Sequence, residues 1–137
     1  MKTKTFFAII AAGVLCGFAR QAVPAEDIDS FPPVVVKTMP EAGSISVPPG
    51  QYEIKVTFSK NMQDHSWSWS TAWTDSTPQV IAGPRYEADH KTCVLKVKLE
   101  ANKTYGWWLN SQKFHNFKDE QGHAAVPYLL VFETGKK

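Results

Sequence analysis

An alternating run of apolar and polar side chains near the middle of the sequence constrains the fold most strongly. Apolar residues occupy every second position from Tyr52 to Phe58, and polar residues fill the positions between them. A period of two places the two sets on opposite faces of a β-strand. Because the apolar face must be covered by a second layer, the run predicts a sheet packed on another element.

Six more stretches favour short strands, and turn-forming residues separate them from one another. They span residues 34–38, 65–73, 79–82, 92–99, 105–110 and 127–134. No stretch has the period of a convincing amphipathic helix, and the segment 113–122 is long enough for a helical turn at most. About seven short strands at such intervals are typical of an all-β chain folded as an immunoglobulin-like antiparallel β-sandwich.

The first residues have the layout of a secretory signal peptide. Lys2 and Lys4 precede the apolar run 6–19, and a small-residue cleavage site follows at Val23-Pro24-Ala25. This order of a positive start, a short apolar run and a small-residue cleavage site predicts a signal peptide over 1–25. The rest of the chain divides into a flexible leader (26–32) and one domain (33–137). We therefore expect an exported protein that resides in the periplasm or outside the cell.

A lipid anchor at Cys16 is the alternative interpretation of the same segment. Leu15-Cys16-Gly17 loosely resembles the motif at which bacterial lipoproteins are acylated. Leu15 is large where such motifs have a small residue, so cleavage after Ala25 is the preferred prediction.

Charge and cysteine content limit the partners and the means of stabilisation. All 13 acidic residues but only 12 of the 15 basic residues follow position 25, which leaves a nearly neutral domain. Such a chain lacks the basic field of a nucleic-acid-binding protein. Only Cys93 remains after cleavage, so the domain has no internal disulfide and depends on burial for its stability.

Five short motifs occur in order once the strands are placed. They are Pro40-Glu41-Ala42-Gly43, Thr57-Phe58-Ser59-Lys60-Asn61-Met62, Leu99 followed by Thr104-Tyr105, Asp119-Glu120-Gln121-Gly122, and Phe132-Glu133-Thr134. Together they resemble the SbsA-type bacterial Ig-like domain over residues 33–134. The resemblance implies a sandwich fold and a role as a spacer or adhesion domain in surface proteins. The residues to which it gives structural roles are Phe58, Met62, Tyr105, Asp119, Gly122 and Phe132.

Two details of these motifs predict local structure. Leu99 and Tyr105 flank a tight strand entry, which predicts a tyrosine corner, in which the buried hydroxyl bonds to the upstream backbone. His123 stands where the family usually has Asn, so the turn after Asp119 has one left-handed residue fewer.

Candidate chemistry is sparse, and we expect neither an enzyme nor a cofactor. His115, Asp119, Glu120 and His123 have the spacing of metal ligands, which leaves a metal-dependent hydrolase as the least favoured alternative. The preferred interpretation is a solvated turn without metal, because no second ligand cluster supports a zinc site.

The five tryptophans fall into two blocks, and their parity separates core from surface. Trp107 shares the parity of Tyr105 and Leu109 and is expected in the core, whereas Trp108 has the opposite parity and should face outward. Trp67 and Trp69 either fill the core as well or, in the case of Trp69, contribute to a binding surface. Trp73 stands where its strand ends. Exposed tryptophans beside polar groups can stack on sugars or dock a protein. The candidate ligand-binding residues are therefore Trp108, Trp73, Trp69, Tyr86 and Asn110.

The sequence thus predicts a non-catalytic Ig-like structural or binding module at the cell envelope, which mediates protein–protein or surface interactions. The alternative is a carbohydrate-binding module that uses exposed tryptophans. The expected partner is an unidentified envelope protein or a glycan and not a nucleic acid. Membrane contact is expected only transiently, through the signal peptide.

Overall fold

The computed structural model describes residues 22–136, and most of the expected signal peptide lies outside these residues. The described chain forms seven strands and one short 3-10 helix, η1. Their bounds are η1 (Ile28–Ser30), β1 (Val35–Met39), β2 (Gly50–Phe58), β3 (Trp69–Thr71), β4 (Gln79–Tyr86), β5 (Thr92–Leu99), β6 (Thr104–Leu109) and β7 (Tyr128–Glu133). No helix within 22–136 is long and apolar enough to cross a membrane.

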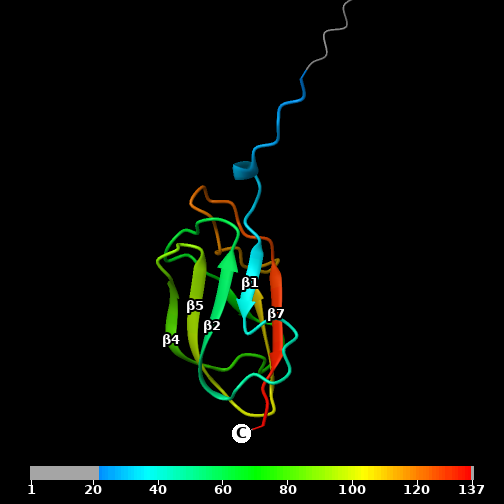
Figure 1. Cartoon of the computed structure of the whole chain (residues 1–137), viewed down its shortest axis with the longest axis vertical. Helices are drawn as coiled ribbons and strands as arrows, with labels where there is room; N and C mark the ends of the chain where they lie inside the picture. Colours follow the sequence, from blue (N-terminus) through cyan, green and yellow to red (C-terminus); the bar gives the residue numbers. More distant parts are fainter. Residues whose placement is uncertain (1–21, 137) are drawn as a thin grey trace, which may run out of the picture.

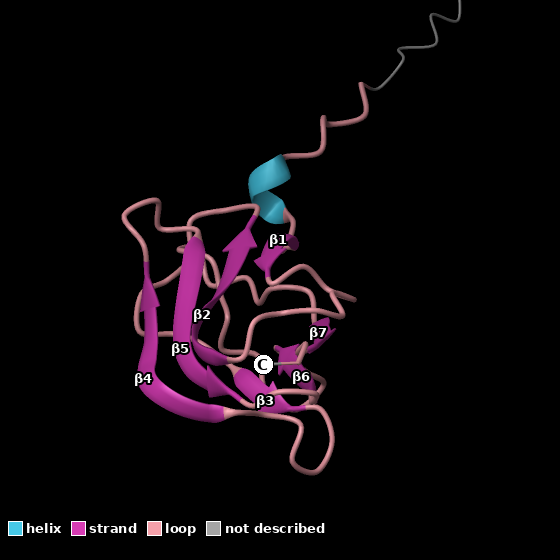
Figure 2. Ribbon diagram, turned by 60° about the horizontal axis from the view of Figure 1, so that its bottom comes forward, coloured by secondary structure: helices cyan, strands magenta, loops and turns pink. Residues whose placement is uncertain are grey.

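The strands form two antiparallel sheets that pack face to face (Figures 1 and 2). One sheet has the order β1-β2-β5-β4 and the other the order β3-β6-β7. This is the arrangement of the seven-stranded immunoglobulin sandwich, in which four strands face three. The predicted fold class is confirmed.

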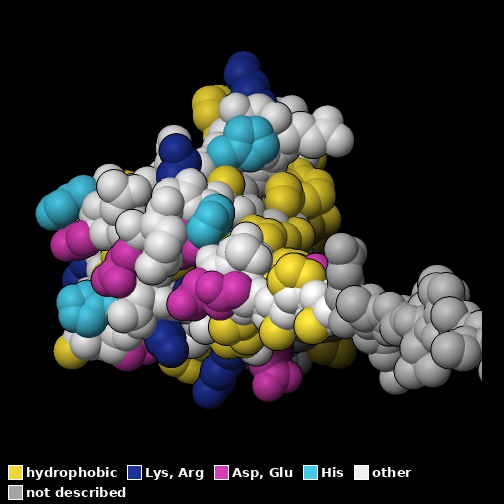
Figure 3. All heavy atoms as spheres, turned by 90° about the horizontal axis from the view of Figure 1, so that it is seen from above, with side chains coloured by type: hydrophobic (Ala, Val, Ile, Leu, Met, Phe, Trp, Pro, Cys, Tyr) yellow, Lys and Arg dark blue, Asp and Glu magenta, His cyan; other side chains and the backbone are white. Residues whose placement is uncertain are grey.

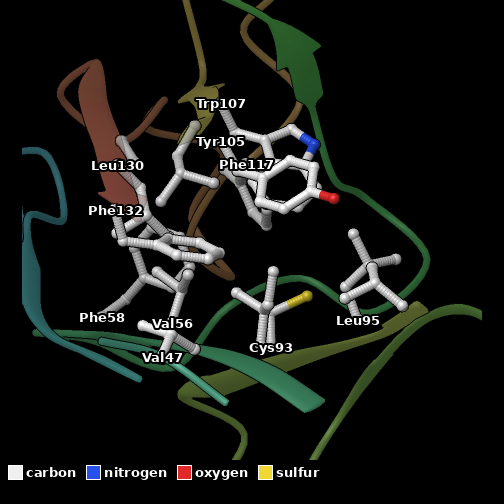
Figure 4. Close-up of a cluster of buried hydrophobic side chains, with 14 of the residues drawn as sticks. Val47, Val56, Phe58, Cys93, Leu95, Tyr105, Trp107, Phe117, Leu130 and Phe132 are labelled. Atoms are coloured by element: carbon white, nitrogen blue, oxygen red, sulfur yellow. The ribbon is translucent and has the colours of Figure 1, made fainter. Parts of the chain in front are cut away.

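The core lies between β2 and β5 on one side and β6 and β7 on the other. The alternation that predicted β2 is observed, since Ile54, Val56 and Phe58 are buried. Val56 pairs with Cys93 of β5 in the antiparallel register, and both are fully buried. Figure 4 shows these side chains pointing toward a second group from the opposite sheet. That group consists of Tyr105, Trp107, Leu130 and Phe132.

Cys93 takes part in this core as an apolar side chain. Burial raises the pKa of its thiol to about 12, although the Trp69 indole acts in the opposite direction. The thiol therefore stays protonated at neutral pH and lacks the thiolate character of a reactive cysteine.

Two strands, β3 and β4, differ most in length from the sequence prediction. β4 continues past 79–82 through Pro84 to Tyr86. Pro84 is tolerated because β4 is an edge strand, where a missing N–H breaks no ladder on its free side. β3 is shorter than the predicted 65–73, because the Ser76 hydroxyl accepts the N–H groups of Ala72 and Trp73 and turns the chain away.

The expected leader lies against the domain at one point. Within 26–32, residues 28–30 form η1, and the Lys60 ammonium donates to the carbonyls of Asp29 (3.0 Å) and Phe31 (2.6 Å).

Tyr105 forms the corner that the sequence predicts. Its hydroxyl accepts a hydrogen bond of 2.8 Å from the Glu100 N–H, and the whole side chain is buried. Thr134 closes the same turn, since its hydroxyl donates to the Glu100 carbonyl and accepts the Lys103 N–H. The connection between β5 and β6 is thereby joined to the end of β7.

Replacing Tyr105 by Phe should lower the free energy of unfolding by about 1–2 kcal/mol, because the Glu100 N–H loses its partner. Urea unfolding measures this change. Tyr128→Phe is the matched control, since Tyr128 is half-buried and its hydroxyl makes no hydrogen bond within the described structure. Equal losses for the two variants would show that the corner bond contributes nothing.

Candidate functional site

The candidate residues predicted from sequence fall on two surfaces and in the core. Trp69 and Tyr86 lie on β3 and β4 and pack against the shared core. Trp73 and Trp108 lie on the outward face of the three-stranded sheet. Asn110 is inside the domain.

A groove opens between the edge strands β3 and β4. Figure 2 shows β4 as the outer strand of its sheet, with one end curving toward β3. The groove has a volume of about 480 Å³, and Leu95 and Trp107 form its buried floor. None of the lining side chains is ionisable. The lining consists of Trp67, Ser68, Trp69, Ser70, Thr71, Thr77, Val80, Pro84, Leu95, Trp107 and Phe114.

Trp69 stands at the centre of this groove wall. Its ring meets Trp107 and Phe117 edge to face, with centroid distances of 5.9 and 5.8 Å. Such contacts fix the ring and bury its apolar area. The indole Nε1–H is buried and acts on the Cys93 thiol of the core, whose pKa it lowers.

The backbone of β3 leaves hydrogen-bonding groups unpaired along the groove. The Ser68 carbonyl accepts the Asn110 N–H, so Ser68 and, two residues on, Ser70 form the bonded pairs with β6. In an antiparallel ladder the intervening residues direct their N–H and C=O groups to the opposite side. The groups of Trp69 and Thr71 therefore point away from β6.

The other three sheet edges are protected in ways that natural proteins commonly use. Hydrogen bonds from segment 43–47 cover β7. β1 carries Lys37 and a register irregularity, with prolines at both ends. β4 contains Pro84 and two irregularities. β3 is protected only by being short.

Tyr86 is packed and is not available as a free polar group. Its ring lies 6.5 Å from the Trp67 ring, centroid to centroid, and its hydroxyl approaches the Ser66 carbonyl at 3.5 Å. Burial raises its pKa above the ordinary value for tyrosine. Tyr86 thus supports the rim of the groove near Trp67.

Trp73 lies on the outward face of β6 over Gly106. A Cβ atom on Gly106 would stand 2.4 Å from Cζ3 of the Trp73 ring, so only glycine allows this contact. Ser76 fixes the same loop, because its hydroxyl donates to the Gly106 carbonyl at 2.7 Å. The ring is held in place and is still 43% exposed.

Trp108 lies farther along β6 and is half-buried on the same outward face, as its parity predicts. It lies across from Leu129 of β7, which is exposed. A hollow of about 450 Å³ adjoins it. Ser111, Gln112, Lys113 and Pro127 complete the lining of that hollow.

Asn110 occupies a different place from the one its alternation predicts. It is fully buried, and its amide nitrogen donates to the carbonyls of Phe117 and Ala125, at 2.9 Å each. Its amide oxygen accepts the Phe117 N–H. The φ angle of 55° at Asn110 ends the strand, so the alternation of β6 no longer applies there. Asn110 holds the loop 110–127 in place and cannot reach a surface ligand.

The acidic and histidine residues near the C-terminus form a structural turn. Asp119 is fully buried and accepts the His123 N–H at 2.7 Å and the Gln121 N–H at 3.1 Å. Its other carboxylate oxygen lies 3.0 Å from His123 Nδ1 and 3.5 Å from the Lys60 ammonium. Gly122, with φ of 91°, closes the turn. The Asp119 carboxylate is therefore engaged within the domain.

The remaining candidate metal ligands do not converge on Asp119. The ring of His115 contacts the Gln112 carbonyl at 2.9 Å, and Glu120 is exposed. Residues 22–136 contain no group of three His, Cys, Asp or Glu side chains able to hold a metal ion. In the view from above, the histidine side chains stand apart from one another (Figure 3).

Comparison with known proteins identifies the family. Residues 29–134 match the family described as bacterial Ig-like domain. The chain belongs to this family. A search of curated proteins and a search of solved structures both gave no match. Family and fold agree, since this bacterial Ig-like domain has the seven strands of the immunoglobulin sandwich.

Several residues of the two surfaces carried no usable signal in the sequence. Val80 and Phe114 are far apart in the sequence and line one groove only because β4 and the loop 110–127 are both beside β3. Gly106 has the parity of Trp108 and therefore faces outward, but nothing in its neighbours in the sequence indicated that Trp73 would cover it. Nothing in the sequence indicated that the Ser76 hydroxyl would end β3.

Replacing Gly106 by Ala should displace the Trp73 ring and lower the free energy of unfolding by about 1–3 kcal/mol, as for other overpacked sites. Tryptophan near-UV circular dichroism and urea unfolding measure the two effects. Gly83→Ala is the matched control, because its Cβ meets nothing within 4 Å. Unchanged tryptophan signals in Gly106→Ala would contradict the contact.

Asp119 should make stability depend on pH in the acid range. Burial alone would raise its pKa, but the hydrogen bonds from the His123 N–H and ring outweigh burial and hold the pKa below its ordinary value of 3.8. A depressed carboxyl pKa contributes stability above 3.8, and this is lost as pH falls through the lower, folded-state value.

We therefore expect Asp119→Asn to cost about 2 kcal/mol near pH 7 and progressively less below pH 3.8. Denaturant unfolding at a series of pH values measures the difference from the unsubstituted protein. Asp75→Asn replaces an exposed carboxylate and should leave the pH profile unchanged. A difference that is constant down to pH 2 would contradict this role of Asp119.

Proposed function

We propose that this bacterial Ig-like domain is a non-catalytic binding module of the cell envelope and that the groove between β3 and β4 holds its partner. The observation that carries the proposal is the lining of the groove, which is aromatic, free of ionisable groups and about 480 Å³ in volume. Concave, mostly apolar surfaces with a few hydroxyl groups are typical of binding sites.

Three further observations support an envelope protein without catalytic activity. The sequence before position 26 has the pattern of an export signal, and the motifs from Pro40 to Thr134 resemble the SbsA-type domains of surface proteins. The side chains best suited to catalytic chemistry are occupied in the fold. Cys93 is buried, and Asp119 accepts hydrogen bonds from the turn that it closes. A partner protein in the periplasm or at the cell surface fits these features.

The proposal is tested by capture from native envelope extract with the purified protein immobilised. Val80→Asp places a charge in the groove, and Ile81→Asp places the same charge beside it on β4 but outside the groove lining. Both side chains are exposed, at 51% and 42%, so neither change should unfold the domain. We expect the partner captured by the unsubstituted protein to be lost from Val80→Asp and retained by Ile81→Asp.

Equal capture by all three proteins would place the binding surface elsewhere. No specific capture by any of them, compared with resin alone, would contradict a binding function in the envelope.

A carbohydrate ligand on the outward face is the second candidate, and the fixed position of Trp73 favours it. An indole ring that is immobilised on Gly106 and remains 43% exposed can stack on a sugar at little entropic cost. The same experiment separates the two candidates. Retention of an envelope glycan that is lost in Trp73→Ala and unaffected in Val80→Asp would favour the outward face.

A further inference from the structure

The free edge of β3 has the pattern of a strand that can accept another strand. Trp69 and Thr71 each direct an N–H and a C=O away from β6, and no described hydrogen bond uses these four groups. Unpaired backbone groups in a row are a template for pairing with an extended chain. The neighbouring edges are closed by covering segments, prolines or irregularities, so β3 is the open edge of the described fold.

The unequal sizes of the two sheets leave room for such a strand. Four strands face three, and the strand without cover is β4, whose residues 79–83 are all exposed. Val80 and Pro84 of β4 form the far wall of the groove that borders β3. An additional strand next to β3 would lie over this wall and the floor at Leu95.

The lining of the groove specifies what kind of chain would fit. It consists of aromatic, aliphatic and hydroxyl side chains, and none is ionisable. A charge brought into such a site would lose its hydration without gaining an ion-pair partner, which is strongly unfavourable. The matching ligand is an uncharged, extended peptide segment with an apolar residue at every second position.

We propose that an extended segment of a partner protein binds by adding to β3 as the fourth strand of the β3-β6-β7 sheet. This inference rests on the proposed function and specifies how its groove recognises a partner. Backbone hydrogen bonds to Trp69 and Thr71 supply the register, and alternate side chains of the segment enter the groove over Leu95 and Trp107.

A second copy of the chain suits this edge less well than a flexible segment does. The free edge spans three residues, from Trp69 to Thr71, and the groove beside it is bounded by β4. Two folded domains joined by so short an edge would bury far less than the roughly 1,200 Å² of a stable interface. Sedimentation velocity tests this point, and a dimer that dissociates in Thr71→Pro would overturn the proposal in favour of self-association.

The direct experiment uses a phage-displayed library of random 12-residue peptides selected against the immobilised protein. Thr71→Pro removes the edge N–H without touching the β3–β6 ladder, a position where edge strands tolerate proline. Thr71→Val keeps the N–H and the shape of the side chain. We expect the selected peptides to be uncharged and alternating, to bind Thr71→Pro at least about tenfold more weakly, and to bind Thr71→Val within about twofold.

A second test uses the unsubstituted protein, so that its result does not depend on whether Thr71→Pro folds. Methylation of the peptide nitrogens at alternate positions should abolish binding in one register and leave it intact in the other, because only one set of N–H groups faces β3. Equal effects of both methylated sets, or equal affinity of Thr71→Pro and Thr71→Val, would overturn strand addition. The same holds if selection enriches no peptide above bare resin.

These outcomes are distinct from failure of the proposed function. If Val80→Asp loses the envelope partner while Thr71→Pro retains it, the groove is the binding site and strand addition is wrong. If no variant affects capture, the groove itself is not the site.

Discussion

The whole structure depends on one apolar interface between two sheets. The described residues contain a single cysteine and no disulfide, so packing across this interface must hold the sandwich together. Val56 and Cys93 supply the centre of one face, and Trp107 and Phe132 lie across from them. The apolar faces of β2 and β5 require a partner layer, and β6 and β7 provide it. The remaining strands are placed at the margins of this core.

Those margins are where the sandwich is incomplete. The four-stranded sheet extends beyond the three-stranded one at β4, and the short β3 leaves part of its edge unpaired. Covering segments or prolines protect the other sheet edges. The unpaired edge at β3 is therefore a local feature of this fold. A common fold can thus carry a specific binding surface at an edge that it leaves open, because function in common folds lies in local sites.

The sequence was sufficient for the regular parts of the fold. The alternation in β2 and β5 and the spacing around Tyr105 predicted strands, inward faces and the corner hydrogen bond. Asn110 was misplaced, because its positive φ ends the alternation and this backbone angle has no signature in the periodicity. The extension of β4 through Pro84 was missed because a proline is acceptable only once the strand is known to be at an edge.

The candidate groove could not be derived from the sequence in the same way. Its lining comes from five separate parts of the chain, between Trp67 and Phe114, and these meet only through the order of the strands. Parity separated Trp107 from Trp108, but it could not show that Trp69 borders an opening while Trp107 forms its floor. The contact of Trp73 with Gly106 depends on the loop geometry set by a single serine hydroxyl.

Whether β3 has an open edge beside the groove can be measured by amide hydrogen exchange, followed by NMR on the free protein. The Ser70 N–H is bonded to β6, whereas the N–H groups of Trp69 and Thr71 point away from it. With an open edge, the Ser70 amide should exchange at least about tenfold more slowly than the amides of Trp69 and Thr71. Equal and strong protection of all three amides would show that the edge of β3 is already paired and therefore closed to another strand.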